Sequence, residues 1–186
     1  MIFHKLRVIN KNQLGFTLVE LMLAMAISGV IIGGISTTIY QVVIGNLRTG
    51  NHMTAVRQVQ EAGYWVSHDA HMTQNVELAD VSVDDPDGTR FPFTLTWTEW
   101  DTNNVHQVVY SIVGDELQRI HSIDGTTDTS IIVAEFIDSS EKDGEPQTKC
   151  EFVGGKLNLM VTATLGAGSQ EQSETRTYEI VPRPGS

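Results

Sequence analysis

The stretch Gly15-Phe16-Thr17-Leu18-Val19-Glu20 separates two segments of opposite character. Residues 1–14 carry three basic residues and no acidic one, whereas residues 21–47 contain no charged residue at all. A run of about 20 apolar residues is enough for a helix to cross a bilayer. Glu20 is therefore a lone carboxylate at the head of a potential membrane helix. A carboxylate at the membrane centre costs about 2.5 kcal/mol or more, so Glu20 needs a functional explanation and a partner.

A secretory signal peptide explains this arrangement poorly. Such a peptide has an apolar core of about 7–15 residues followed by a small-residue cleavage site. Here the small residue, Gly15, precedes the apolar run, so that cleavage after it would leave the membrane helix on the mature protein. An uncleaved anchor is compatible with the pattern but gives no reason for Glu20.

The order of basic leader, glycine, Phe-Thr-Leu-Val-Glu and apolar helix resembles the type IV prepilin family, which includes the type II secretion pseudopilins. The resemblance implies that a membrane aspartyl peptidase, the prepilin peptidase, cuts between Gly15 and Phe16 and methylates Phe16. It also implies that Glu20 corresponds to the glutamate through which pilins dock on one another during filament assembly.

The resemblance also supplies a partner for the acid. Cleavage would create an α-amine at Phe16, which is largely cationic at pH 7. In the family, the glutamate of one subunit meets the amine of its neighbour, and opposite charges attract far more strongly in a low-dielectric medium than in water. The alternative is that Glu20 extends to the lipid headgroups.

Composition limits the classes of function. The chain has 186 residues and a net charge of −11, and loss of the basic leader would make it more acidic. An acidic domain argues against nucleic-acid binding, which needs a basic surface.

Cys150 is the single cysteine, so no disulfide can form within the chain. A buried structural thiol is one role for it, and a reactive or intermolecular thiol is the other.

Periodicity predicts an α+β fold in which a long N-terminal helix packs on a C-terminal antiparallel β-sheet. We expect a leader over 1–15, a helix over 16–75 with its transmembrane part at about 16–44, and a β-rich domain over 76–186. Spacings of 3 and 4 place Val56, Val59, Gly63, Val66 and Ala70 on one buried face of the helix. The small residues Gly29, Gly33 and Gly34 lie on one side of the membrane part, which fits either close helix packing in a filament or the ordinary tolerance of glycine in membrane helices.

Alternating apolar residues predict the strands. The predicted ranges are 76–83, 91–97, 105–113, 117–123, 131–137, 149–152, 156–165 and 175–181, joined into one sheet that the last strand closes. We expect a polar loop over 124–129, a mobile loop over 139–147 and a flexible hairpin tip over 166–173. Basic residues before the first helix favour a cytoplasmic leader and an extracytoplasmic β domain, in a single-pass cytoplasmic membrane protein.

Two segments refine the resemblance. Residues 64–70 and the hairpin 109–120 are similar to J-type minor pseudopilins and to PilW-like minor pilins. This likeness implies a minor subunit of a type IV pilus or of a type II secretion pseudopilus, placed in a complex near the filament tip. The implied partners are the prepilin peptidase, other pilins and, indirectly, an assembly ATPase with its membrane platform.

Other candidate sites are weaker. His68 and His71, with Asp69, share a helix face but provide too few ligands for a metal. Asp85 and Asp87 resemble the start of a calcium loop whose later ligands are missing, so a turn is favoured. No nucleophile elbow or phosphate loop is present in the sequence, so we expect no catalysis and no cofactor.

Three tryptophans are compatible with a sugar-binding function. Trp65, Trp97 and Trp100 could form a sugar-binding platform, with Trp97 expected in the core and Trp100 expected at the surface. The alternative function is therefore a binding module, either an adhesin or an uptake receptor displayed on a pilus.

Overall fold

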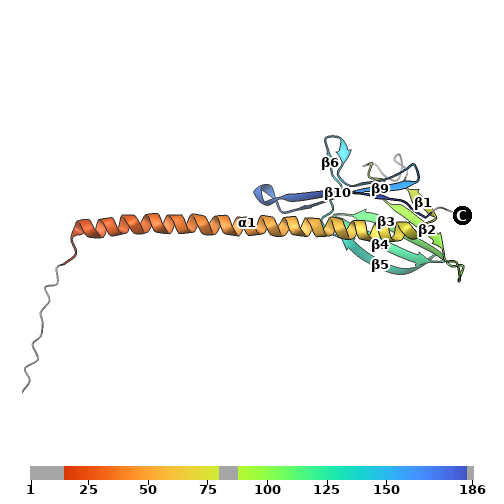
Figure 1. Cartoon of the computed structure of the whole chain (residues 1–186), viewed down its shortest axis with the longest axis horizontal. Helices are drawn as coiled ribbons and strands as arrows, with labels where there is room; N and C mark the ends of the chain where they lie inside the picture. Colours follow the sequence, from red (N-terminus) through yellow and green to blue (C-terminus); the bar gives the residue numbers. More distant parts are fainter. Residues whose placement is uncertain (1–14, 80–87, 184–186) are drawn as a thin grey trace, which may run out of the picture. The chain divides into compact units, whose positions relative to one another are not determined.

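The computed structural model describes residues 15–79 and 88–183 (Figure 1). It contains the helix α1 (Leu18–Met72), the short 3-10 helix η1 (Gly168–Gln170) and the following strands: β1 (Asn75–Leu78), β2 (Phe93–Thr98), β3 (Val105–Val113), β4 (Glu116–Ile123), β5 (Thr126–Ala134), β6 (Glu141–Lys142), β7 (Glu145–Pro146), β8 (Lys149–Val153), β9 (Lys156–Leu165) and β10 (Gln172–Ile180). The predicted fold class, one long N-terminal helix with antiparallel β-structure after it, is confirmed.

The chain divides into two compact units, Met1–Ile44 and Gly45–Ser186, and the boundary falls within α1. The described part of the first unit is the N-terminal part of α1, where every side chain from Leu18 to Val43 is exposed. The second unit holds the rest of α1 and all strands, and it has a hydrophobic core of its own.

The larger sheet is an antiparallel meander in the order β1-β2-β3-β4-β5. The strand predicted over 105–113 has these bounds in β3, which buries Val108 and Tyr110 on the face predicted to be apolar. The polar loop predicted over 124–129 is wrong. Asp124 and Gly125 both have positive φ, 48° and 78°, and they turn the chain tightly from β4 into β5, which begins at Thr126.

The remaining strands form separate sheets rather than closing a single one, which the sequence analysis did not predict. A three-stranded sheet has the order β10-β9-β8, and β6 with β7 forms a small hairpin. That hairpin occupies the predicted mobile loop, and it turns at Asp143 and Gly144, whose φ angles are again both positive. The predicted flexible tip over 166–173 holds η1 and the start of β10.

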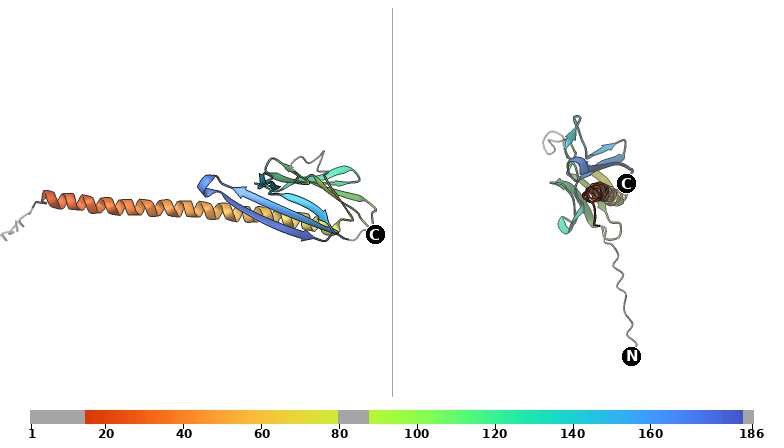
Figure 2. Two further views of the ribbon diagram at one scale, coloured as in Figure 1. Left: turned by 90° about the horizontal axis from the view of Figure 1, so that it is seen from above. Right: turned by 90° about the vertical axis from the view of Figure 1, so that its left-hand side faces the viewer.

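The C-terminal part of α1 packs against both sheets (Figure 2). Its buried face includes the predicted Val59, Gly63, Val66 and Ala70, whereas Val56 is half-buried and Ala55 takes its place in the core. Strand β9 buries every second residue from Leu157 to Ala163, as its alternation predicts.

Gly63 permits the close approach of α1 to β10. A Cβ atom at this position would lie 2.1 Å from Cζ of Tyr178, a distance that no side chain tolerates. The Tyr178 hydroxyl donates to the Val59 carbonyl oxygen at 2.9 Å, which fixes the crossing. The helical cost of this glycine, about 1 kcal/mol, is thus offset by the packing it allows.

Cys150 is fully buried in the core, as the structural interpretation predicts. Burial, with a smaller contribution from the charge of Glu151, raises the pKa of its thiol above the ordinary value, which disfavours the reactive thiolate.

Candidate functional site

The predicted processing and assembly residues lie together at the start of α1. Gly15 and Phe16 precede the helix and are exposed, and Glu20 lies in its first turn and is also exposed. Thr17 caps the helix, because its hydroxyl accepts a hydrogen bond from the Glu20 backbone N–H at 3.3 Å.

The capping contact suggests a second role for Glu20 that the sequence analysis missed. The spacing Thr17-x-x-Glu20 is that of a capping box, in which the acid would accept from the backbone N–H of the cap residue. Within the described residues, however, the Glu20 carboxylate makes no hydrogen bond or ion pair. Its charge is therefore available to a partner outside the described chain.

The helix after Glu20 has the composition of a membrane span. α1 includes a window with a mean hydropathy of 2.2, none of which is buried inside the structure. Its hydroxyls are satisfied locally, since Thr37 donates to the Gly33 carbonyl oxygen at 2.9 Å and Thr38 donates to that of Gly34 at 3.0 Å. This surface can be covered by lipid or by neighbouring helices.

The leader and the start of α1 contain a motif that is known from other proteins. Residues 10–36 match the family model described as the prokaryotic N-terminal methylation motif. The chain carries this motif. None of the curated proteins and none of the solved structures compared with the chain matches it.

The methylation motif covers Gly15, Phe16 and Glu20 and supports a type IV pilin-like subunit that is processed at its N-terminus. The motif suggests a structural subunit rather than an enzyme, and the apolar helix after it has the length and composition of a membrane anchor. The motif ends at Ser36, before the two segments that resemble the minor subunits.

A buried charge cluster joins α1 to the larger sheet, and the sequence analysis did not anticipate it. Asp69 is 0% exposed on the face of α1 that includes Val66 and Ala70. Arg119 on β4 donates to both of its oxygens, from Nε at 2.7 Å and from a terminal nitrogen at 3.1 Å. The Tyr110 hydroxyl on β3 donates to the same carboxylate at 2.6 Å.

The surroundings of the cluster favour this pairing. Burial and then the charge of Asp69 raise the pKa of Tyr110 well above its ordinary value, so that the phenol stays a donor. Burial alone would lower the pKa of Arg119, but the hydrogen bond and the charge of Asp69 outweigh it and raise that pKa. The Arg119 guanidinium also lies 5.2 Å from the centre of the Trp65 ring, in a cation–π contact.

The cluster accounts for one of the weaker candidate sites. Both Asp69 oxygens are used by Arg119, Tyr110 and a 3.3 Å contact with His68. In the parts of the chain that the structure describes, no group of three His, Cys, Asp or Glu side chains is placed to hold a metal. The calcium candidates Asp85 and Asp87 lie outside the described residues.

The three tryptophans do not form one platform. Trp65 lies against Arg119, while Trp97 and Trp100 line a common pocket. Trp100 is 98% exposed, as expected. Trp97 was expected in the core, but it is only half-buried: it packs against the core and stacks on His106, with ring centres 5.2 Å apart.

Proposed function

We propose that the chain is a minor pilin or pseudopilin, a structural subunit of a type IV pilus or of a type II secretion pseudopilus. The match to the methylation motif over residues 10–36 is the observation that carries this proposal. The prepilin peptidase cuts between Gly15 and Phe16 and methylates Phe16. The subunit then enters the filament through its N-terminal helix, driven indirectly by an assembly ATPase and its platform.

Glu20 is the assembly residue in this proposal. Its carboxylate has no partner among the described residues, and it heads a long helical surface that is exposed throughout. The amine of a neighbouring Phe16 would complete the pair. Before assembly, the subunit spans the cytoplasmic membrane once, with residues 1–15 cytoplasmic and the β-rich domain of residues 76–186 extracytoplasmic.

The likeness of two segments to J-type and PilW-like subunits is the support for proposing a place in a tip complex. The two segments that carry it, residues 64–70 and 109–120, are in direct contact through the buried cluster. Asp69 belongs to the first segment, whereas Tyr110 and Arg119 belong to the second. Their shared contact gives a physical reason for the two segments to occur together in one chain.

Replacing Gly15 with Val should abolish processing. The bulk of valine would obstruct the peptidase, and it cannot disturb the described fold, because no atom lies within 4 Å of a Cβ placed at Gly15. Full-length protein is co-expressed with a prepilin peptidase, and intact mass is measured. We expect loss of residues 1–15 from the wild type and an uncut Gly15→Val variant.

Gly29→Ala is the matched control, because its Cβ also meets nothing within 4 Å and it lies away from the cleavage point. It should be cut like the wild type. Normal cutting of Gly15→Val, or a cut at any other bond of the wild type, would refute the proposed processing.

A further inference from the structure

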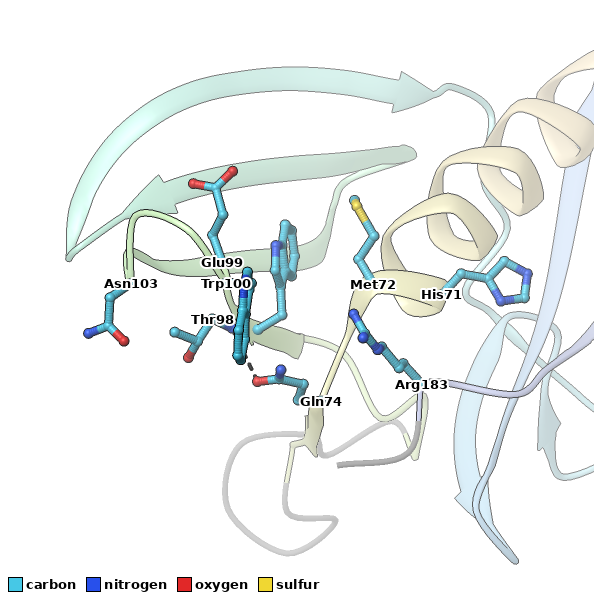
Figure 3. Close-up of a pocket in the computed structure, with 9 residues that line it drawn as sticks. His71, Met72, Gln74, Thr98, Glu99, Trp100, Asn103 and Arg183 are labelled. Carbon is cyan, nitrogen blue, oxygen red and sulfur yellow. Dashed lines mark hydrogen bonds between the residues drawn. The ribbon is translucent and has the colours of Figure 1, made fainter. Parts of the chain in front are cut away.

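A pocket of about 780 Å³ lies at the C-terminal end of α1, within the second unit (Figure 3). Its side chains come from the end of the helix, the residue Gln74 after it, the end of β2, the β2–β3 connection with Trp100 and Asn103, and Arg183 after β10. This volume is within the range of small-ligand sites, about 300–1,000 Å³.

Trp100 is the unusual member of this pocket. It is 98% exposed and stacks on no other ring in the part of the chain that the structure describes. Single exposed apolar residues are common, but Trp100 shares its pocket with Trp97 and with the partly exposed Met72. The pocket thus offers exposed aromatic surface that a ligand can cover.

Hydrogen bonds hold the turn that carries Trp100. The Glu99 N–H donates to the Asn104 carbonyl oxygen at 2.9 Å, and the Asn103 N–H donates to the Glu99 carbonyl oxygen at 3.0 Å. Asn103 has a φ of 59°, the left-handed conformation that asparagine tolerates better than most residues. Because the turn is already ordered, a ligand would not have to immobilise it.

Planar polar groups line the same pocket as the Trp100 indole. The Gln74 side-chain oxygen accepts from the Thr98 N–H at 3.2 Å, and this leaves the amide NH2 group as a free donor. The side chains of Asn103 and Arg183 make no hydrogen bond with other described residues. The pocket therefore combines a flat apolar surface with donors and acceptors at its edge.

We propose that this pocket binds a neutral saccharide. One face of a sugar ring presents C–H groups, which match the negative face of an indole, while its hydroxyls match amide and guanidinium groups at the edge. Among the described lining residues, Arg183 and Glu99 carry opposite charges and balance one another. The net charge of −11 disfavours a polyanionic ligand.

The site binds the saccharide without cleaving it. Glycoside hydrolysis uses two carboxyl groups about 5–9.5 Å apart. Glu99 is the one carboxylate among the described residues of the lining, and it already accepts a hydrogen bond from the Thr102 hydroxyl. Binding belongs to the single subunit, so it does not depend on incorporation into a filament.

The test uses the full-length protein in a detergent without a sugar headgroup, since maltoside and glucoside detergents would compete for the site. Isothermal titration calorimetry with cellotetraose, chitotetraose, mannotetraose and maltotetraose, and with a tetrauronate as the charged comparison, identifies the ligand. We expect saturable binding of at least one neutral tetrasaccharide, and at least tenfold weaker binding by Trp100→Leu.

Further variants test the chemistry of the contact. Trp100→Phe should retain part of the affinity that Trp100→Leu loses, because it keeps an aromatic face. Asn103→Gly keeps the left-handed backbone, removes the side-chain amide and should weaken binding severalfold. Tyr64→Ala removes another exposed aromatic residue, outside the pocket, and should bind like the wild type.

Three results would overturn the proposal. They are the absence of binding by every neutral tetrasaccharide, equal binding by Trp100→Leu and the wild type, and binding of the tetrauronate alone. Each result leaves the proposed processing at Gly15 untouched, because that is measured separately.

Discussion

Arg119→Met is expected to lower the free energy of unfolding by about 3–5 kcal/mol, the cost of breaking a buried ion pair by removing one partner. Asp69 is 0% exposed, and Arg119 donates two hydrogen bonds to it, so the substitution leaves a buried carboxylate without its cation. Met fills much of the same volume, which keeps the loss of packing small.

Urea unfolding of the full-length protein in detergent, followed by tryptophan fluorescence, measures this effect. All three tryptophans lie in the unit Gly45–Ser186, so the signal reports on the β-rich unit rather than on the N-terminal part of α1. Arg57→Met is the matched control. It breaks an exposed pair with Glu61 four residues along α1, so it should lower the free energy of unfolding far less than Arg119→Met does.

A double variant shows how much of the loss of stability comes from leaving the Asp69 charge unpaired. Asp69→Leu combined with Arg119→Met removes both charges, and it should be more stable than Arg119→Met alone because no unpaired charge remains. The Tyr110 hydroxyl would lose its acceptor, which should leave a residual cost of about 1–3 kcal/mol. A value for Arg119→Met close to that of the wild type would show that the cluster contributes little.

Glu20→Ala and Glu20→Gln are both expected to reduce incorporation into filaments at least tenfold. A tenfold change needs only about 1.4 kcal/mol. An ion pair at 4 Å interacts with about 4 kcal/mol at an effective dielectric constant of 20. Incorporation is measured by isolating sheared filaments from the native host and quantifying the subunit by immunoblot against the membrane fraction.

The glutamine variant distinguishes the two roles of Glu20. Glutamine serves in a capping box as glutamate does, but it carries no charge to pair with an amine. Thr17→Ala is the complementary control: it removes the acceptor of the Glu20 N–H, keeps the acid, and should incorporate normally. Normal incorporation of Glu20→Gln would contradict the pairing role.

The sequence predicts the strands whose side chains alternate, and it fails where they do not. β3 and β9 each bury alternate residues, and their bounds were predicted correctly. The first half of β5, by contrast, is exposed, and its run of Thr, Asp and Ser shows no alternation. The Asp124-Gly125 and Asp143-Gly144 pairs are favoured hairpin turns, a signal that the sequence analysis overlooked.

The division into separate sheets could not be predicted in this way. Alternation fixes which face of a strand is buried, but it leaves open which strand is its neighbour. The same limit applies to the buried cluster, since nothing local in the sequence places Arg119 of β4 beside Asp69 of α1. The one available signal was the position of Asp69, three residues after Val66 on the apolar face.

The candidate sites differ in how far the sequence determines them. Gly15, Phe16 and Glu20 form a contiguous motif that can be read directly, and the family comparison finds the same segment. The pocket, however, combines residues from the end of α1, the β2–β3 connection and the segment after β10. Only the fold brings them together, although the exposure of Trp100 was predictable from its place just after a strand.

The central claim is that the amine which pairs with Glu20 exists only after the leader has been removed. Intact-mass measurement of the protein from its native host tests this claim directly. The account predicts a chain that begins at Phe16 and carries one added methyl group on its α-amine. A chain that still begins at Met1 would contradict it.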